Sequence, residues 1–329
     1  MKRAVIHIVL MVLAVVLFYT EIRFGSIKMT NADFWDRLIE NDPVLWAFRI
    51  PAACTAALAG ACLGLSGWLL QTLFRNPLAG PSILGITSGS SLMVALVLLA
   101  GFSFSGIFSS LGLVAAALIG SFGVLALILL VSSRVKQLAT VLIFGLMIGY
   151  LLGAFQSILI DAAGKSELKS FVSWGLASFG NYRDGQLWML LGSLVLGVLT
   201  VLKLGSKLDF WLLGEDYARS LGVNVKSFRM ALLAVCGVLA GVVTAYCGPV
   251  AFLGLAMPHA VRMFYKEPHH LKFLTVLLLT GACAGMLCEL ITRMPWSSSV
   301  LPLNAVTSFL GAPVVIWLLV KSRKSKIRF

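Results

Sequence analysis

The sequence predicts an all-α integral membrane protein with about ten transmembrane helices. Hydrophobic residues make up 59% of the chain and charged residues only 12%, whereas soluble globular proteins carry about 25% charged residues. Apolar segments long enough to cross a bilayer recur along the whole sequence, and the segments between them divide into a strongly basic set and a nearly neutral set. We therefore expect residues 1–329 to form one transmembrane domain without a soluble domain.

Ten segments approach the roughly 20 mostly apolar residues that a spanning helix needs. They are residues 4–20, 52–71, 83–100, 111–131, 139–160, 186–203, 229–247, 250–264, 271–290 and 303–320. The third and the eighth are short or interrupted by glycine and proline. Broken helices are tolerated at membrane depth only where protein or a water-filled cavity surrounds them. We therefore expect a pathway or substrate cavity in this protein.

The charge distribution predicts the orientation of the spans. If both termini are cytoplasmic, the cytoplasmic segments hold 18 of the 26 lysines and arginines but only 4 of the 13 acidic residues. Such a bias is the usual topology signal of membrane proteins. The net charge of +13 therefore reflects topology and contact with anionic lipids, to which the basic tail 321–328 is expected to bind, rather than nucleic-acid binding.

Two features that could suggest secretion or metal binding have simpler explanations. The N-terminal segment has a basic start and an apolar run, but no small-residue cleavage site follows, so we interpret it as a retained first span. The six cysteines lie in or near spans without metal-type spacing. We expect them to be small buried side chains.

The larger of the outer segments are residues 21–49 and 161–185. In the second, Leu168, Phe171 and Val172 fall on one face of a helix. This spacing predicts a short helix lying at the outer surface, over about residues 165–180.

A compact polar segment, residues 206–226, has the properties of a docking site for a partner outside the bilayer. Gly214 and Gly222 permit sharp turns. Glu215 and Asp216 suit the positive end of a helix dipole. Arg219, one turn later, is placed to pair with Glu215 or to reach the partner. The alternative is a cytoplasmic loop whose charges merely remain solvated.

The chain also contains a weak internal sequence similarity. Residues 80–85 read Gly-Pro-Ser-Ile-Leu-Gly, and residues 248–254 read Gly-Pro-Val-Ala-Phe-Leu-Gly. Both follow one span and open another, on opposite sides of the predicted membrane. An inverted repeat of spans two to five in spans seven to ten would produce this pattern, and chance similarity is the alternative.

Five motifs, in this order and spacing, resemble the permease subunits of type II ABC importers, the family that takes up iron–siderophore complexes, haem and vitamin B12. They are Arg49-Ile50-Pro51, the segment from Arg75 to Gly85, the segment from Gly214 to Val223, the segment from Phe252 to Arg262, and Leu301-Pro302 with Gly311-Ala312-Pro313. The resemblance extends from the second span to the C-terminus. It implies a transport subunit with the inverted repeat of the family, not an enzyme.

The resemblance also implies the partners of the chain. These are a second copy of the permease in a homodimer, two cytoplasmic ATPase subunits, and an extracytoplasmic substrate-binding protein. The implied location is the bacterial inner membrane. No cofactor is expected on this chain, because ATP and magnesium would bind the ATPase. An iron complex is the favoured cargo, with cobalamin as the alternative.

The resemblance assigns roles to individual residues. The coupling segment that docks on the ATPase comprises Gly214, Glu215, Asp216, Tyr217, Ala218, Arg219, Ser220, Leu221 and Gly222. The positions expected to line or shape the pathway are Asn76, Pro77, Gly85, Gln156, Pro258, His259, Thr307, Gly311 and Pro313.

Two outer arginines, Arg49 and Arg293, match positions that dock the binding protein. Arginine suits this role because its planar fork pairs with a carboxylate through two hydrogen bonds. The alternative is that both side chains extend toward lipid headgroups. The sequence departs from the family pattern at Ala52, where a further arginine is expected, and at Asn304 and Val315 near the pathway.

Three local patterns suggest other functions. Gly164-Lys165-Ser166 lacks the earlier glycine of a phosphate-binding loop, since residue 159 is leucine. Ser66 and His259 would have to lie within hydrogen-bond reach to act as a protease dyad. His269 and His270, near Glu267, could suggest a metal site, although a solvated loop is the simpler interpretation.

The main rival function is an ion-coupled secondary transporter. Such a transporter would share the broken helices and the inverted repeat. It usually needs ionisable residues within the membrane. Here Asp161 and Glu289 fall only at span ends, which favours an external ATPase as the energy source.

Overall fold

The computed structural model describes residues 2–24, 31–99, 107–135, 137–181, 185–265, 269–293 and 301–322. Within these ranges the chain is helical and contains no β-strand. The bundle consists of α1 (Lys2–Arg23), α3 (Ile50–Phe74), α4 (Ile86–Leu99), α5 (Ile107–Arg134), α6 (Leu138–Asp161), α8 (Gln186–Leu213), α10 (Val225–Cys247), α11 (Leu253–Phe264), α12 (His270–Thr292) and α13 (Leu303–Ser322). Each corresponds to one predicted span, so the all-α membrane fold is confirmed.

Seven helices in the described part of the chain are long and apolar enough to cross a membrane, judged by length and composition. The predicted short spans, the third and the eighth, are α4 with 14 residues and α11 with 12 residues. Pro258 lies inside α11, where it removes a backbone donor and disfavours a longer regular helix. Both helices are held among neighbours, as broken spans require.

The sixth span is longer than predicted. We expected it to end at residue 203, but α8 continues without interruption to Leu213 and ends only at Gly214. Residues 204–213 contain no glycine after Gly205 and no proline, so nothing in their sequence breaks the helix. Residues 206–213 of the predicted docking segment are therefore a rigid extension of a spanning helix.

Four short helical segments accompany the bundle. They are α2 (Asn31–Ile39), the π-helical turn η1 (Val44–Arg49) that runs into α3, α7 (Lys165–Gly175) and α9 (Glu215–Ser220). The surface helix predicted over 165–180 is α7, and it ends five residues early. The backbone leaves the helix there because Ala177 adopts a φ of 59° and the Leu176 carbonyl accepts a hydrogen bond from Asn304 N–H, 3.1 Å away.

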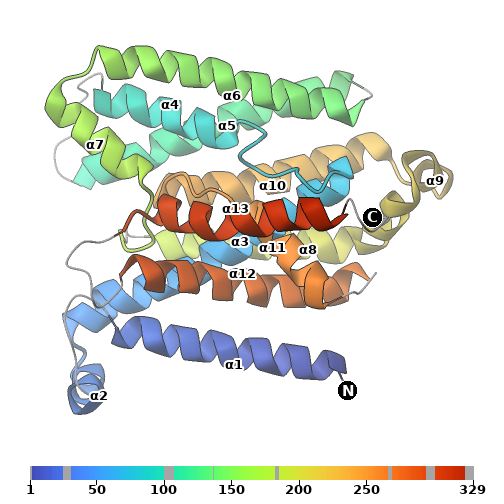
Figure 1. Cartoon of the computed structure of the whole chain (residues 1–329). Coiled ribbons are helices and arrows are strands. Elements are labelled where there is room, and N and C mark those ends of the chain that lie inside the picture. The colour runs from blue at the N-terminus through green and yellow to red at the C-terminus, as the bar shows by residue number, and fades with distance from the viewer. Residues whose placement is uncertain are drawn as a thin grey trace.

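The long helices run side by side, and Figure 1 shows what lies at each end of the bundle. The first turn of α1, the end of α8 and the short helix α9 lie at one end, on the right of the view. The helices α2 and α7 lie at the opposite end. This separation agrees with the predicted topology, in which α9 and the N-terminus share one side of the membrane.

The packing of the helices follows the proposed inverted repeat. When α3–α6 are matched in order with α10–α13, their contacts are matched too. Helix α3 packs against α12 as α10 packs against α5, and α3 packs against α11 as α10 packs against α4. The contacts of α4 with α5 and α6 likewise correspond to those of α11 with α12 and α13. The two halves therefore have the same internal architecture.

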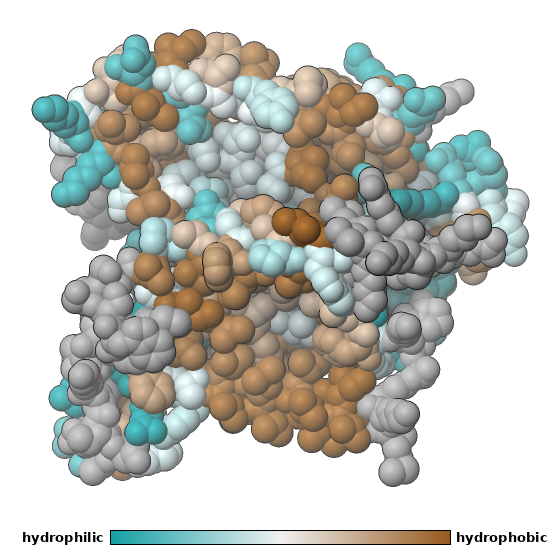
Figure 2. Space-filling view, viewed as in Figure 1, coloured by the Kyte–Doolittle hydropathy of each residue, from teal (hydrophilic) through white to brown (hydrophobic). Residues whose placement is uncertain are grey.

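The exterior of the bundle carries a band of apolar side chains. Figure 2 shows this band over α1, with hydrophilic residues at both ends of the molecule. The side chains of Val9, Val12 and Val15 on α1 are more than half exposed. Because a soluble protein rarely leaves so large an apolar surface uncovered, this face is suited to contact with lipid.

Helix α3 lies at the centre of the bundle and crosses α12 at very short range. A Cβ atom added at Gly60 of α3 would overlap the carbonyl oxygen of Gly281 on α12, and one added at Gly285 would overlap that of Ala56. Only glycine permits such an approach of two backbones. The sequence of α3 is rich in glycine and alanine for this reason.

We predict that Gly60→Val destabilises the bundle, because the two helices would have to separate. Overpacking of a core typically costs about 1–3 kcal/mol. The melting temperature of the purified protein in detergent measures this loss. Gly192→Val on α8 is the matched control, since nothing lies within 4 Å of a Cβ atom at that position. Equal melting temperatures for the two variants would contradict the prediction.

Candidate functional site

The candidate site is the coupling segment, residues 214–222, which forms a helical knob between α8 and α10. Gly214 ends α8 with a φ of 139°, and Gly222 follows α9 with a φ of 83°. The Val223 N–H donates to the Ala218 carbonyl at 3.0 Å, which closes the end of α9. Asn224 then caps α10 by accepting from the Ser227 N–H at 3.1 Å. The two predicted sharp turns are thus present.

Charges fix the knob to the bundle. Glu215 and Asp216 lie in the first turn of α9, as predicted, and Glu215 pairs with Arg219 at 3.2 Å. Its other carboxylate oxygen lies 3.6 Å from Arg229 of α10. Arg229 is buried and also donates to the Val135 carbonyl at 2.9 Å. Glu215 therefore connects α9 to α10, and Arg229 extends that connection to the end of α5.

The side chains of the knob divide into an inner and an outer set. Ala218 is fully buried against the bundle. Tyr217 and Leu221 are 51% and 46% exposed, and Leu213 beside them is 66% exposed. Exposed aromatic and aliphatic side chains on a polar, protruding segment are typical of a protein docking surface.

Trp211 anchors the knob from below, in the last turn of α8. Its side chain is fully buried, and its indole N–H donates to the Leu73 carbonyl at 3.1 Å. Its ring lies 5.2 Å from that of Phe228 on α10. Arg75 lies over the same ring at 5.2 Å and donates to the Trp211 carbonyl at 2.7 Å. The tryptophan thus joins α8 to both α3 and α10.

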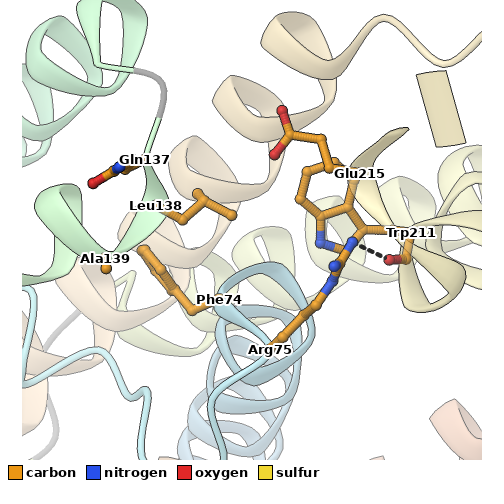
Figure 3. A pocket seen from close by; sticks show the side chains of 7 residues that line it. All are labelled: Phe74, Arg75, Gln137, Leu138, Ala139, Trp211 and Glu215. Atoms are coloured by element: carbon orange, nitrogen blue, oxygen red, sulfur yellow. Dashed lines mark hydrogen bonds between the residues drawn. The ribbon is translucent and has the colours of Figure 1, made fainter. Parts of the chain in front are cut away.

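A pocket of about 490 Å³ opens beside the knob. It is lined by Phe74, Arg75, Gln137, Leu138, Ala139, Trp211 and Glu215. Figure 3 shows Arg75, Trp211 and Glu215 on one side and Phe74 and Leu138 facing them from the other. The walls therefore come from the end of α3, the start of α6, and the junction of α8 with α9.

The two outer arginines are both engaged by the bundle. Arg49 is 4% exposed, and its guanidinium donates to the carbonyls of Ile22 and Arg23, each at 2.8 Å. It therefore satisfies the last carbonyl groups of α1. Arg293 follows the last turn of α12, pairs with Glu289 at 2.6 Å and remains partly exposed. These contacts give both residues structural roles, and docking stays a prediction.

The motif around Asn76 follows the end of α3 and is bonded to the middle of α11. Asn76 accepts a hydrogen bond from the Leu78 N–H at 2.9 Å and so shapes the turn. The Pro77 carbonyl accepts from His259 Nε2–H at 2.7 Å. His259 thus satisfies a backbone group at a broken span, one residue after Pro258. Gly85 begins α4 with a φ of 73°, in close contact with the backbone of α6.

The other expected pathway residues lie on α6 and α13, the last helices of the two halves. Gln156 is half-buried on α6. On α13, Thr307 is buried and donates to the Asn304 carbonyl, Gly311 packs against Phe252, and Pro313 is exposed. Of the residues that depart from the family pattern, Val315 is buried and Asn304 half-buried on α13, whereas Ala52 is buried in the first turn of α3.

The protease alternative loses its geometric basis. Ser66 donates to the Cys236 carbonyl at 3.1 Å, whereas His259 donates to the Pro77 carbonyl, so the two side chains serve different helices. The described residues contain no group of three or more histidine, cysteine or acidic side chains that could hold a metal ion. The cysteines among them are free, and all except half-buried Cys54 are buried.

The expectation of a solvated loop at the histidine pair is wrong for His270. This residue begins α12, is only 4% exposed, and donates a hydrogen bond from Nδ1 to Asp209 of α8. His269 is exposed, and Glu267 lies outside the described residues. His270 is buried because its ring packs on Trp68, 5.3 Å away.

Trp211, Arg229 and Asp209 were not singled out from the sequence. Trp211 carried a recognisable signal, because it is an aromatic residue inside a basic, polar segment. Arg229 and Asp209 carried none, since a charged residue near a span end is ordinarily solvated. Their partners come from distant parts of the chain, and only the folded structure brings them together.

Comparisons with known proteins agree on one family. A family model described as the FecCD transport family matches residues 12–321. The chain is 30% identical over 325 residues to the hemin transport system permease HmuU of Yersinia pestis, covering 96% of each protein. It is 33% identical over 281 residues to the vitamin B12 import system permease BtuC of Klebsiella pneumoniae, covering 85% of this chain and 83% of that protein.

A solved structure shares the fold over nearly the whole length. It is described as an inward-facing conformation of a metal-chelate type ABC transporter, and it superposes with a TM-score of 0.83 at 28% sequence identity. The match covers 97% of this chain and 99% of that one. The helix arrangement described above is therefore that of an ABC transporter membrane subunit.

We predict that Trp211→Ala destabilises the protein, whereas Tyr217→Ala does not. Truncation of a buried tryptophan typically costs about 3–5 kcal/mol, and here the Leu73 carbonyl would also lose its donor. Tyr217 is half-exposed, so its removal leaves no cavity. Melting temperatures of the two purified variants in detergent measure the difference. A Trp211→Ala protein as stable as Tyr217→Ala would contradict this account of the anchor.

Proposed function

Because the chain belongs to the FecCD transport family, we propose that it is the permease that moves an organic metal complex across the cytoplasmic membrane with energy from a separate ATPase. The chain itself is the membrane permease subunit of a type II ABC importer. The relatives named above carry hemin and vitamin B12. The cargo class is therefore an iron–siderophore complex, haem or cobalamin, and an iron complex remains the favoured member.

The observation that carries this proposal is the geometry of the coupling segment. Tyr217, Leu221 and Leu213 present an apolar surface at one end of the bundle, while Ala218 and Glu215 fix the same segment to it. A knob that is exposed on one side and anchored on the other can receive force from a partner. We infer that this partner is the ATPase and that ATP and magnesium bind there.

The anchored knob supports a simple mechanism of coupling. Closure of the ATPase pair would displace α9, and α9 is joined to α8 by the single residue Gly214. Trp211 and Arg229 connect the displaced segment to α3, α10 and the end of α5. Movement of the knob would therefore tilt several spans as rigid bodies and open or close the pathway.

Ion coupling receives little support from the buried acidic residues. Glu21 and Glu289 are both buried, but they lie in the last turns of α1 and α12, at the end of the bundle opposite to α9. Glu289 is paired with Arg293 and is within reach of the Thr292 hydroxyl. A proton or sodium relay would need such groups along the middle of the spans.

A homodimer would place the pathway between two permeases. Tyr150 and Ile158 on α6 and Phe309 and Ile316 on α13 are each more than 60% exposed in the single chain. Figure 2 shows the surface receding between α6 and α13. A second copy against these helices would cover apolar side chains and would bring Gln156 and Thr307 toward a shared passage.

The remaining partners follow from the topology. We place α9, the N-terminus and the C-terminus on the cytoplasmic side, where basic residues meet anionic lipid. The end of the bundle that carries α2, α7, Arg49 and Arg293 then faces the binding protein. Arg293 is the better exposed of the two arginines.

The function is tested in proteoliposomes that contain the permease, its copurified ATPase and the binding protein. Ferric siderophore, hemin and cobalamin are supplied in parallel, with and without ATP. We expect ATP-dependent uptake of one of these complexes. In the same assay, Glu215→Lys combined with Arg219→Glu should lower uptake by roughly tenfold or more, because a lysine at position 215 would face buried Arg229.

Lys203→Glu is the control, because Lys203 is an exposed charged residue on α8 outside the coupling segment. Uptake without ATP, or uptake by the permease alone, would overturn the proposal in favour of an ion-coupled carrier. Undiminished uptake by the doubly substituted protein would remove the coupling role of this segment without affecting the assignment of the chain as a permease.

Docking of the binding protein makes a separate prediction. Arg293→Gln should weaken its binding by roughly tenfold, since a hydrogen bond to a charged partner contributes about 1.5–3 kcal/mol. Arg37→Gln is the control, because Arg37 is also an outer arginine paired with a carboxylate, Asp42 at 3.0 Å. Surface plasmon resonance with the permease in nanodiscs measures both affinities. Equal affinities would exclude Arg293 from the docking surface.

A further inference from the structure

The extension of α8 below the coupling segment is held on two sides. On one side, Trp211 binds α3 and α10 as described. On the other side, two residues earlier, Asp209 accepts a hydrogen bond from His270 Nδ1–H at the start of α12. Positions two apart on a helix lie on nearly opposite faces. The last turns of α8 are therefore clamped between separate helices.

His270 is built into a buried cluster rather than a surface contact. The centroid of its ring lies 5.3 Å from that of Trp68 on α3 at a tilted angle, and the Trp68 ring lies 5.2 Å from that of Phe273 on α12. Arg262 of α11 lies over Phe273 and donates to Gln71 of α3 at 3.0 Å. The imidazole thus has a fixed position, and its bond to Asp209 is the polar contact between this cluster and α8.

The geometry suits the transfer of movement from α8 to α12. A hydrogen bond from a neutral donor to a carboxylate is strong and directional. The His270 ring is fixed by its packing, whereas the Asp209 side chain is 36% exposed and is held by the bond itself. Asp209 lies in the same unbroken helix that carries α9 at its end. Helix α12 in turn touches α3 backbone to backbone at Gly60 and Gly281. A displacement of α8 would therefore reach α12 through this polar pair, beside the direct packing of α8 on α3 and α12.

We propose that Asp209 and His270 form a second transmission contact, which couples movement of the ATPase-docking segment to α12. Both are positioning residues and touch neither substrate nor nucleotide. This inference rests on the proposed function. It differs from a purely structural role, because it requires the pair to set how much substrate moves for each ATP hydrolysed, and not only how stable the bundle is.

The test measures the number of substrate molecules imported per ATP hydrolysed in the reconstituted complex of permease, ATPase and binding protein. Asp209→Leu and His270→Leu should each lower this ratio by roughly fivefold or more, the lower end of typical coupling effects. Asp209→Asn keeps a carbonyl oxygen to accept from Nδ1 and should retain most of the ratio. His269→Leu is the matched control, because His269 is exposed and adjacent.

A double-substitution cycle separates the proposal from simple loss of stability. If the two residues act through each other, the doubly substituted Asp209→Leu/His270→Leu complex should have a ratio no lower than either single variant. An unchanged ratio in the single variants would overturn the proposal. A ratio in the double variant lower than in either single variant, as expected for independent effects, would also overturn it. The same holds if Asp209→Asn lowers the ratio as much as Asp209→Leu does. Failure of the wild-type complex to import with ATP would instead reject the proposed function itself.

Discussion

The structure depends on one constraint, which is that carbonyl groups at helix ends inside an apolar bundle must find donors. The last carbonyls of a helix have no partner within it, and those buried against neighbouring helices are cut off from water. This chain meets the constraint with long polar side chains from neighbouring helices. Arg49 serves the end of α1, Arg229 the end of α5, and Trp211 the end of α3. Each capped end also fixes two helices together.

This way of satisfying helix ends concentrates mechanical connections near the coupling segment. Arg75 serves the Trp211 carbonyl, and His259 serves the Pro77 carbonyl in the turn that follows. The bonds that complete the backbone are therefore also the bonds that hold α8 and α11 to the end of α3, and α10 to the end of α5. Glu215 links α9 to this set through Arg229. The contacts that would transmit force are therefore the same contacts that supply hydrogen-bond donors to the helix ends.

Local sequence features predicted most of the fold and the outline of the site. The ten spans followed from apolar length, and the turns at Gly214 and Gly222 followed from residue type. The pair of Glu215 with Arg219 followed from helical spacing. The contacts of Glu215 with Arg229, of Trp211 with Leu73, and of Asp209 with His270 did not. They join residues far apart in the chain. In the sequence, a charged residue near a span end gives no sign of whether its side chain is solvated or buried.

The backbone contact between α3 and α12 has a consequence for intervention in transport. Where Gly60 meets Gly281, no layer of side chains separates the two helices. Side chains can change rotamer and so allow neighbouring helices to slide, but two touching backbones offer no such freedom. We therefore expect α3 and α12 to move together as one rigid body. A drug or nanobody that immobilised the exposed end of either helix would arrest both, and the surface of α12 would give access to the centre of the transporter.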